Sequence, residues 1–191
     1  GRRFLKAYQE RSLARLHRQR EQEDAFVRLA RETIEQYVRY KEVLRCPGTL
    51  PEEMRKRRAG VFVSLKKDGR LRGCIGTIQA VQASLAEEII YNAVSACSKD
   101  PRFEPVSQEE LEHLTIHVDV LGDTERIDSP EELDVKRYGV IVTSGYRRGL
   151  LLPNLEGVDT VEEQIAIARQ KAGIGGTEEV ELERFEVVRH F

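Results

Sequence analysis

Two segments of the chain carry the same series of structural signals, and this repeat constrains the fold more than any other feature. Gly60–Ser64 reads Gly-Val-Phe-Val-Ser, and Gly139–Thr143 reads Gly-Val-Ile-Val-Thr. Beyond them the two copies align without a gap at a separation of 76 residues, which places Arg148 on Arg72. Chance seldom preserves turn, helix cap and apolar register together, so we predict an internal duplication.

Each copy predicts a hairpin, a helix and a returning strand. The helices start with the same capping box, Ser84 with Glu87 in the first copy and Thr160 with Glu163 in the second. The returning strands are Leu114–Leu121, which alternates apolar and polar residues, and Val180–Val188. The prediction is an α+β fold of mainly antiparallel strands flanked by helices, with repeats at about 60–121 and 139–188.

The first hairpin turns at Asp68-Gly69, a strong signal for a two-residue loop. Such a loop pairs Lys67 with Arg70, Leu65 with Arg72, and Val63 with Cys74. Because cross-strand partners share a face, this register predicts Cys74 on the apolar side of the hairpin.

Composition limits the class of protein. The 191 residues are 40% hydrophobic and 34% charged, enough for a core and too apolar for global disorder. No segment is apolar over the length of a membrane span, no secretory signal is present, and three cysteines form no Cys-x-x-Cys pair. We therefore expect a cytoplasmic protein with reduced thiols.

Charge separates the first 22 residues from the rest. Residues 1–22 carry seven Lys or Arg and two Glu, a charge of +5, whereas the remaining 169 residues carry −7. We predict a basic helical extension or linker at 1–22 and a domain at 23–191 that begins with an amphipathic helix from Asp24 to about Lys41. The acidic body argues against nucleic-acid binding by the domain, and only the extension offers a basic arm.

Several motifs, in order, resemble a known family. They are Leu71-Arg72-Gly73-Cys74-Ile75-Gly76, Asp100-Pro101-Arg102-Phe103, Glu110-Leu111 through Leu121, Tyr138-Gly139-Val140-Ile141-Val142, Gly149-Leu150-Leu151-Leu152-Pro153 and Leu155 through Gln164. From about Asp24 onward the chain resembles protein A of the AmmeMemoRadiSam system, an AMMECR-type domain shared with the AMME-syndrome candidate-gene family. The resemblance implies duplicated α+β units that share a barrel-like sheet. It also implies two partners, a Memo-like protein related to class III extradiol dioxygenases and a radical SAM enzyme, and it brings no settled activity.

Cys74 and Arg72 are the candidate catalytic residues. A thiol beside a guanidinium and between Gly73 and Gly76 would have a lowered pKa and room for a substrate. The alternative is a small buried hydrophobe, because Leu150 occupies the equivalent position in the second copy. Gly73 and Gly76 lie within a predicted strand, where glycine indicates a bulge or close approach by a ligand or another chain. Because Gly149 repeats Gly73, the alternative for Gly73 is helix–strand packing.

The loop Asp100–Phe103 is a candidate binding site. Arg102 could donate a bidentate pair of hydrogen bonds to an anion, and Phe103 could stack on a planar ligand. The alternative is that Asp100 and Arg102 lock the loop while Phe103 fills the core. Arg148 and Gly149 are the equivalents of Arg72 and Gly73 in the second copy. We predict that both pairs, with Gly76, also take part in binding a ligand or partner, because two guanidinium groups suit a carboxylate or phosphate.

Metal and cofactor sites are not predicted. His113, His117 and Asp119 lie on one face of the strand Leu114–Leu121 or beside it, and we predict a solvated face rather than a metal site. Gly173-Ile174-Gly175-Gly176 follows no strand, so we predict a helix stop rather than a phosphate cradle.

The residues contain no complete catalytic constellation. The leading hypothesis is therefore a non-catalytic or co-catalytic module that docks a partner or presents a small molecule through a groove bordered by the two Arg-Gly strands. The alternative is an enzyme that uses Cys74 with Arg72 on an unidentified substrate, with Asp100 as a further candidate. Substrate and oligomeric state do not follow from the sequence.

Overall fold

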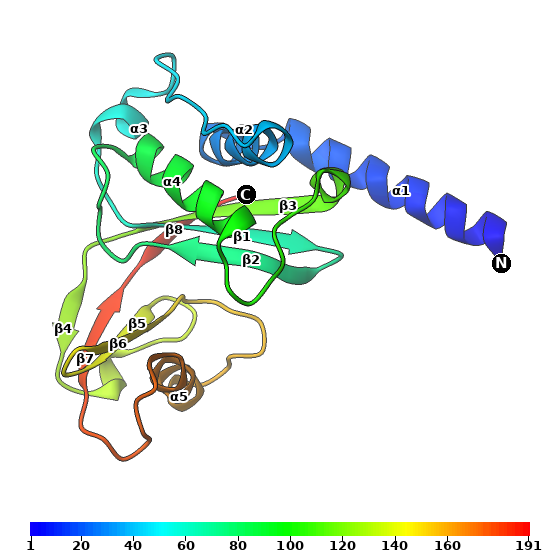
Figure 1. Ribbon diagram of the computed structural model, residues 1–191. Coiled ribbons are helices and arrows are strands. Elements are labelled where there is room, and N and C mark those ends of the chain that lie inside the picture. The colour runs from blue at the N-terminus through cyan, green and yellow to red at the C-terminus, as the bar shows by residue number, and fades with distance from the viewer. The chain divides into compact units, whose positions relative to one another are not determined.

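Eight strands are shared between two four-stranded antiparallel sheets in the computed structural model, which describes all residues 1–191 (Figure 1). The strands are β1 (Val61–Lys67), β2 (Arg70–Gly76), β3 (Leu114–Leu121), β4 (Glu125–Ile127), β5 (Gly139–Ser144), β6 (Arg147–Leu151), β7 (Glu181–Phe185) and β8 (Val187–His190). The α-helices are α1 (Arg2–Glu21), α2 (Ala25–Tyr40), α3 (Glu52–Lys56), α4 (Leu85–Ser98) and α5 (Val161–Ala172), and η1 (Gln108–His113) and η2 (Pro130–Glu132) are 3₁₀ helices. The expected α+β class is confirmed.

The chain divides into two compact units. Unit 1 comprises Gly1–Val120 and Arg189–Phe191, and unit 2 comprises Leu121–Val188. The first sheet has the order β2-β1-β3-β8, and the second has the order β4-β7-β5-β6. Each unit has its own hydrophobic core.

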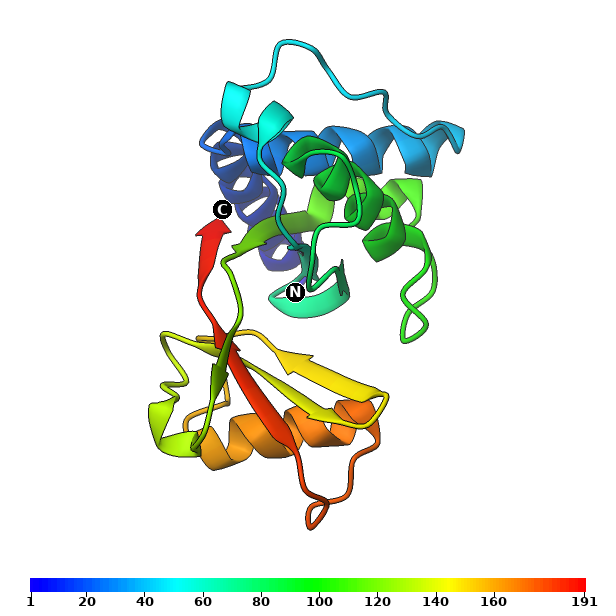
Figure 2. The ribbon, with the colours of Figure 1, turned by 90° about the vertical axis from the view of Figure 1, so that its left-hand side faces the viewer.

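The core of unit 1 lies between its sheet and two helices. Helix α4 packs on β1 and β2, and α2 packs on α4 (Figures 1 and 2). Both helices begin where the sequence predicts, because Asp24 accepts hydrogen bonds from the Phe26 and Val27 amides and Ser84 accepts one from the Glu87 amide. The inward side chains of β1 are fully buried against them.

The core of unit 2 lies between its sheet and α5. Val140 and Val142 from β5 pack with Ala168 of α5 and Leu182 of β7. Thr160 caps α5 through the Glu163 amide, as predicted. Gly173 ends the helix with a φ of 70°, so the predicted helix stop is confirmed.

No closed barrel is found, which corrects the fold that the resemblance implies. Strand β2 is an edge strand, and its outer side is covered by a loop: the Cys74 amide donates to Asp100, and Arg102 donates to the Cys74 carbonyl. The predicted last strand, Val180–Val188, is also divided. Its residues form β7 and the first part of β8, which belong to different sheets.

The two sheets follow the same plan. In each, the strand after the long helix pairs with the first strand of the hairpin: β3 with β1 and β7 with β5. Each fourth strand comes directly after the third strand of the other sheet. These features agree with a duplication, which stays a prediction until the two hairpin–helix units are superposed.

Candidate functional site

A bulge in the β1–β2 hairpin decides which face Cys74 occupies. Lys67 opposes Arg70 as predicted, and Asp68 and Gly69 turn with φ of 52° and 74°. The register then shifts by one residue at Arg72.

The shift moves Gly73, Cys74, Ile75 and Gly76 by one place against β1. Leu65 pairs with Gly73 and Ser64 with Cys74, so the predicted partners Arg72 for Leu65 and Val63 for Cys74 are wrong. Because a shift of one residue reverses the faces, Cys74 lies opposite Ser64 and away from the apolar side, half-buried.

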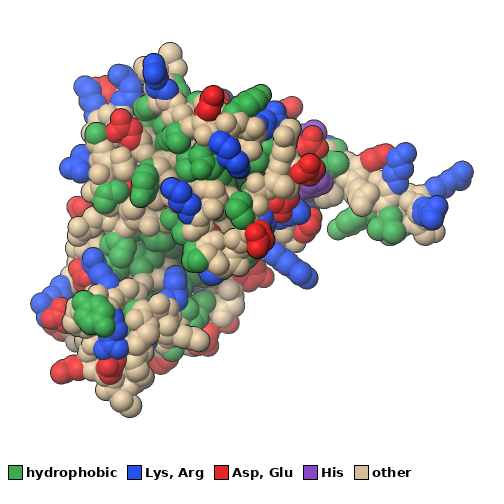
Figure 3. Space-filling view, in the orientation of Figure 1, with side chains coloured by type: hydrophobic (Ala, Val, Ile, Leu, Met, Phe, Trp, Pro, Cys, Tyr) green, Lys and Arg blue, Asp and Glu red, His purple; other side chains and the backbone are tan.

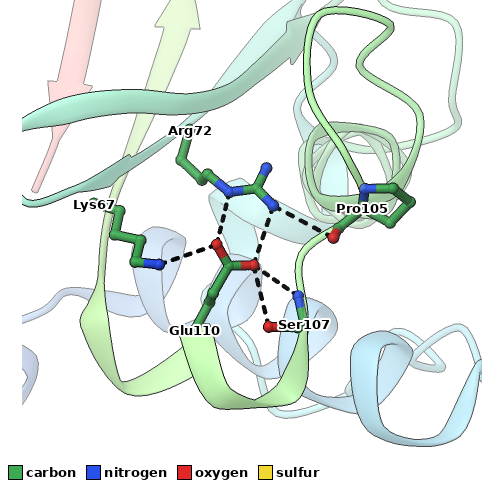
Figure 4. A network of polar contacts seen from close by, with 5 residues as sticks. All are labelled: Lys67, Arg72, Pro105, Ser107 and Glu110. Atoms are coloured by element: carbon green, nitrogen blue, oxygen red, sulfur yellow. Dashed lines mark hydrogen bonds and ion pairs between the residues drawn. The ribbon is translucent and has the colours of Figure 1, made fainter.

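Arg72 is held by Glu110 (Figure 4). Its Nε donates to Glu110 Oε1 at 2.9 Å, and its Nη2 donates to Oε2 at 3.0 Å and to the Pro105 carbonyl at 3.3 Å. Lys67 and the Ser107 amide also donate to the Glu110 carboxylate. The Arg72 side chain is only 15% exposed, so this guanidinium fastens the hairpin to η1.

Acid is expected to weaken two ion pairs, Arg72 with Glu110 and Arg102 with Asp100. The Arg72 guanidinium lowers the pKa of Glu110 to about 2, and the Arg102 guanidinium lowers the pKa of Asp100 to about 2. A carboxyl group with a lowered folded-state pKa stabilises the fold above its unfolded pKa, and that stabilisation is lost as pH falls. We expect the free energy of unfolding to fall between about pH 5 and pH 2, by about 2 kcal/mol for each carboxyl group.

Urea titrations across this pH range test the expectation. The Glu110→Gln variant should show a smaller loss than the wild type, and Glu109→Gln, an exposed neighbour, should match the wild type. Equal pH dependence in all three proteins would contradict the assignment.

The two glycines beside Cys74 are approached by the chain itself. A Cβ on Gly73 would lie 2.4 Å from the Ala96 carbonyl oxygen of α4, and a Cβ on Gly76 would lie 2.2 Å from the Phe62 ring. In unit 2 a Cβ on Gly149 would lie 2.1 Å from the Ala168 carbonyl oxygen of α5. Close helix–strand packing therefore explains Gly73 and Gly149 without a ligand.

Asp100 and Arg102 form a fixed corner at the edge of β2. Asp100 is 5% exposed and accepts from the Cys74 amide at 3.0 Å and from Arg102 Nε and Nη2 at 3.0 and 2.8 Å. The side chain of Arg102 stays 52% exposed, and its guanidinium lies 5.4 Å from the centre of the Phe103 ring. Phe103 is half-buried on the loop and belongs to neither core.

Cys74 lies in one row with Ser64 and His117, whereas the sequence predicted Val63 opposite Cys74 and a solvated face for His117. Ser64 pairs with Cys74 on one side and with His117 on the other. The Ser64 Oγ lies 3.3 Å from the Cys74 Sγ. His117 Nδ1 is buried without a hydrogen-bond partner, and burial lowers the pKa of His117. The bulged hairpin register places Ser64 opposite Cys74, whereas the position of His117 depends on the pairing of β1 with β3.

The predicted solvated face of β3 is wrong for Asp119. This carboxylate is fully buried and accepts a hydrogen bond from Arg189 Nε of β8 at 2.7 Å. The Phe191 ring lies edge-on to His117, with 5.3 Å between ring centres. The C-terminal strand, whose place at the sheet edge the sequence does not reveal, covers this side of β3.

The second Arg-Gly pair lies in unit 2. Arg148 Nη2 donates to Glu183 of β7 at 3.0 Å, and Arg148 is partly exposed. Arg72 and Arg148 thus belong to different sheets and each has its own acidic partner.

Comparison with known proteins decides the family. Residues 27–190 match the family model described as AMMECR1. The chain belongs to the AMMECR1 family. The match starts inside α2, so α1 lies outside the AMMECR1 domain.

Relatives of this AMMECR1 domain occur in bacteria and archaea. A protein of Thermotoga maritima is 53% identical over 170 residues, which cover 88% of this chain and 98% of the relative. A protein of Clostridium acetobutylicum is 52% identical over 172 residues, and the match covers 90% of this chain but only 36% of that longer relative. The crystal structure of an uncharacterized protein from Pyrococcus horikoshii has a TM-score of 0.79 at 34% identity, covering 86% of this chain and 88% of that one.

The AMMECR1 domain combines a fixed guanidinium with a thiol at one edge. No three His, Cys, Asp or Glu side chains are grouped so that they could hold a metal ion. None of the helices has both the length and the apolar character needed to cross a bilayer. At the edge of β2 the structure places the half-exposed guanidinium of Arg102 next to the half-buried residue Cys74.

Proposed function

We propose that this AMMECR1 domain is a binding module that recognises a carboxylate or phosphate group at the edge of β2, through Arg102 beside Cys74. The observation that carries the proposal is the half-exposed guanidinium held by a buried carboxylate. Asp100 fixes Nε and Nη2, so the orientation of the group is set before a ligand arrives. A preorganised donor loses little entropy on binding.

This proposal moves the anion-binding role from Arg72 to Arg102. Arg72 directs its hydrogen bonds to Glu110 and Pro105 and is largely buried. Arg148 stays a candidate of unit 2 because it is partly exposed beside Glu183. Arg102 is the more exposed of the two arginines beside Cys74.

The second candidate function is a cysteine-dependent reaction at Cys74. The row of Cys74, Ser64 and His117 favours it, because a neutral imidazole on the same sheet face can accept a proton. In this alternative Arg102 would stabilise the thiolate or the substrate. The thiol of Cys74 would then react faster than an ordinary cysteine.

One alkylation experiment separates the two candidates. Cys74 is modified with anionic iodoacetate and with neutral iodoacetamide, and mass spectrometry follows each cysteine. Cys46 and Cys97 are internal standards, since burial raises the pKa of both, that of Cys97 to about 11. We expect Cys74 to prefer iodoacetate over iodoacetamide more than Cys46 does, and inorganic phosphate to reduce this preference.

The Arg102→Gln variant should lose the preference for the anionic reagent, and Arg102→Lys should recover part of it. Arg70→Gln, which removes an exposed cation from the same strand, is the matched control. An anion preference at Cys74 no larger than at Cys46 would refute the binding proposal. Fast alkylation by both reagents with a low apparent pKa, weakened by His117→Gln, would favour the cysteine-dependent reaction.

We also propose that the module works in the cytosol beside the partners of its system, a Memo-like protein and a radical SAM enzyme. The support is membership of the AMMECR1 family and the resemblance of the motifs from Leu71 to Gln164 to protein A. Purified partners from the same organism should bind the domain in a pull-down. Absence of binding to both would refute this part of the proposal.

A further inference from the structure

Helix α1 exposes apolar side chains that nothing in unit 1 covers. Phe4, Leu5 and Tyr8 are 79%, 58% and 66% exposed. Only the second half of α1 is held, where Arg20 donates to the Leu111 carbonyl. The first half projects from the rest of unit 1, with apolar side chains gathered beside Lys and Arg (Figures 1 and 3).

The AMMECR1 fold does not require α1. The family match starts at residue 27, and the Thermotoga relative aligns over 98% of its own length while covering 88% of this chain. An exposed apolar group on a helix of charge +5 is unfavourable for an isolated protein and suits a docking helix.

Unit 2 offers the complementary surface. It carries fifteen Asp or Glu and eight Lys or Arg, so its net charge of −7 equals the whole excess of the chain outside residues 1–22. A cavity of about 570 Å³ lies beside α5, lined by apolar residues that include Val161, Ile165, Ala166 and Ile174.

One carboxylate and one guanidinium line this cavity, and two more carboxylates follow Pro130 in the sequence. Glu162 lines the cavity, and Glu131 and Glu132 are exposed neighbours of Pro130, another lining residue. Arg169 is the single cation among the lining residues, and its Nη1 donates to the carbonyls of Gly175 and Glu178.

We propose that α1 of one chain docks into the α5 groove on unit 2 of a second copy. Phe4, Leu5 and Tyr8 would enter the apolar cavity, while the Lys and Arg residues of α1 face exposed carboxylates of unit 2, whose net charge is −7. A pair of α1 helices would repel each other at +5 each, so the helix binds the acidic unit. Reciprocal exchange between two copies closes the assembly as a dimer with two identical contacts.

Sedimentation velocity on the full chain tests the proposal. At low ionic strength we expect the protein to sediment as a dimer of two 21.9 kDa chains. In 1 M salt, where charges are screened beyond about 3 Å, the dissociation constant should rise at least about tenfold.

Two variants address the two sides of the contact. Phe4→Ser/Leu5→Ser/Tyr8→Ser removes the apolar side chains of α1, and Ala166→Arg places a cation at an exposed position of the groove. Each should weaken association at least about tenfold without changing thermal unfolding. Tyr146→Ser, which alters a side chain that is 95% exposed on the β5–β6 turn, is the control and should leave the dimer intact.

A mixture of the two variants provides the decisive measurement. One copy then has an intact groove and the other an intact α1, so one contact can form and association should partly return. A wild-type monomer at all accessible concentrations, or a dimer unaffected by both variants, would overturn the proposal. A mixture that stays monomeric would also overturn it.

Discussion

Gly73→Ala is expected to lower the free energy of unfolding by about 3 kcal/mol. The new Cβ would lie 2.4 Å from the Ala96 carbonyl oxygen, which belongs to the backbone of α4 and cannot rotate away. Either the helix or the β2 edge must move, and the packing of α4 on the sheet would be lost with it. Urea denaturation with linear extrapolation gives the difference directly.

Gly48→Ala is the matched control. A Cβ at Gly48 meets nothing within 4 Å, so this variant should lie within about 0.5 kcal/mol of the wild type. Gly149→Ala should resemble Gly73→Ala, because its Cβ would lie 2.1 Å from the Ala168 carbonyl oxygen. A Gly73→Ala protein as stable as Gly48→Ala would show that helix packing is not the reason for this glycine.

Arg189→Met is expected to cost about 3 kcal/mol. Asp119 is fully buried and receives two hydrogen bonds from the Arg189 guanidinium. Removal of the arginine leaves a buried carboxylate on β3 without the two charge-assisted hydrogen bonds that it accepts from β8.

Two further variants test the physical reason. Asp119→Val/Arg189→Met should recover much of the lost stability, because a buried ion pair replaced by apolar side chains is often neutral. Arg126→Met removes an ion pair whose side chains are 70% and 63% exposed, and it should cost less than about 1 kcal/mol. Equal losses for Arg126→Met and Arg189→Met would contradict the role given to burial.

The elements of this fold follow from local sequence signals. Asp24, Ser84 and Thr160 start helices where the sequence places them, and Gly173 ends one. These signals are local because a cap or a turn needs only residues a few positions apart. The α+β class follows from their order.

The candidate site depended on pairings between distant residues. Nothing near Arg72 in the sequence distinguishes a residue that binds a ligand from one that binds Glu110, 38 positions further on. Arg102 differs from Arg72 because its partner, Asp100, is only two residues away in the sequence. This pairing leaves about half of the Arg102 side chain exposed.

The sequence by itself determined the hairpins, the helix caps, the alternation of β3 and the family of the chain. Tertiary structure alone decided the bulge at Arg72, the division of the last strand between two sheets, and the row of Cys74, Ser64 and His117. The reason is that strand register and sheet membership are set by packing and by hydrogen bonds between segments far apart in the chain. The extra residue Arg72 in β2 reverses the faces that the predicted hairpin register assigned to the residues after it.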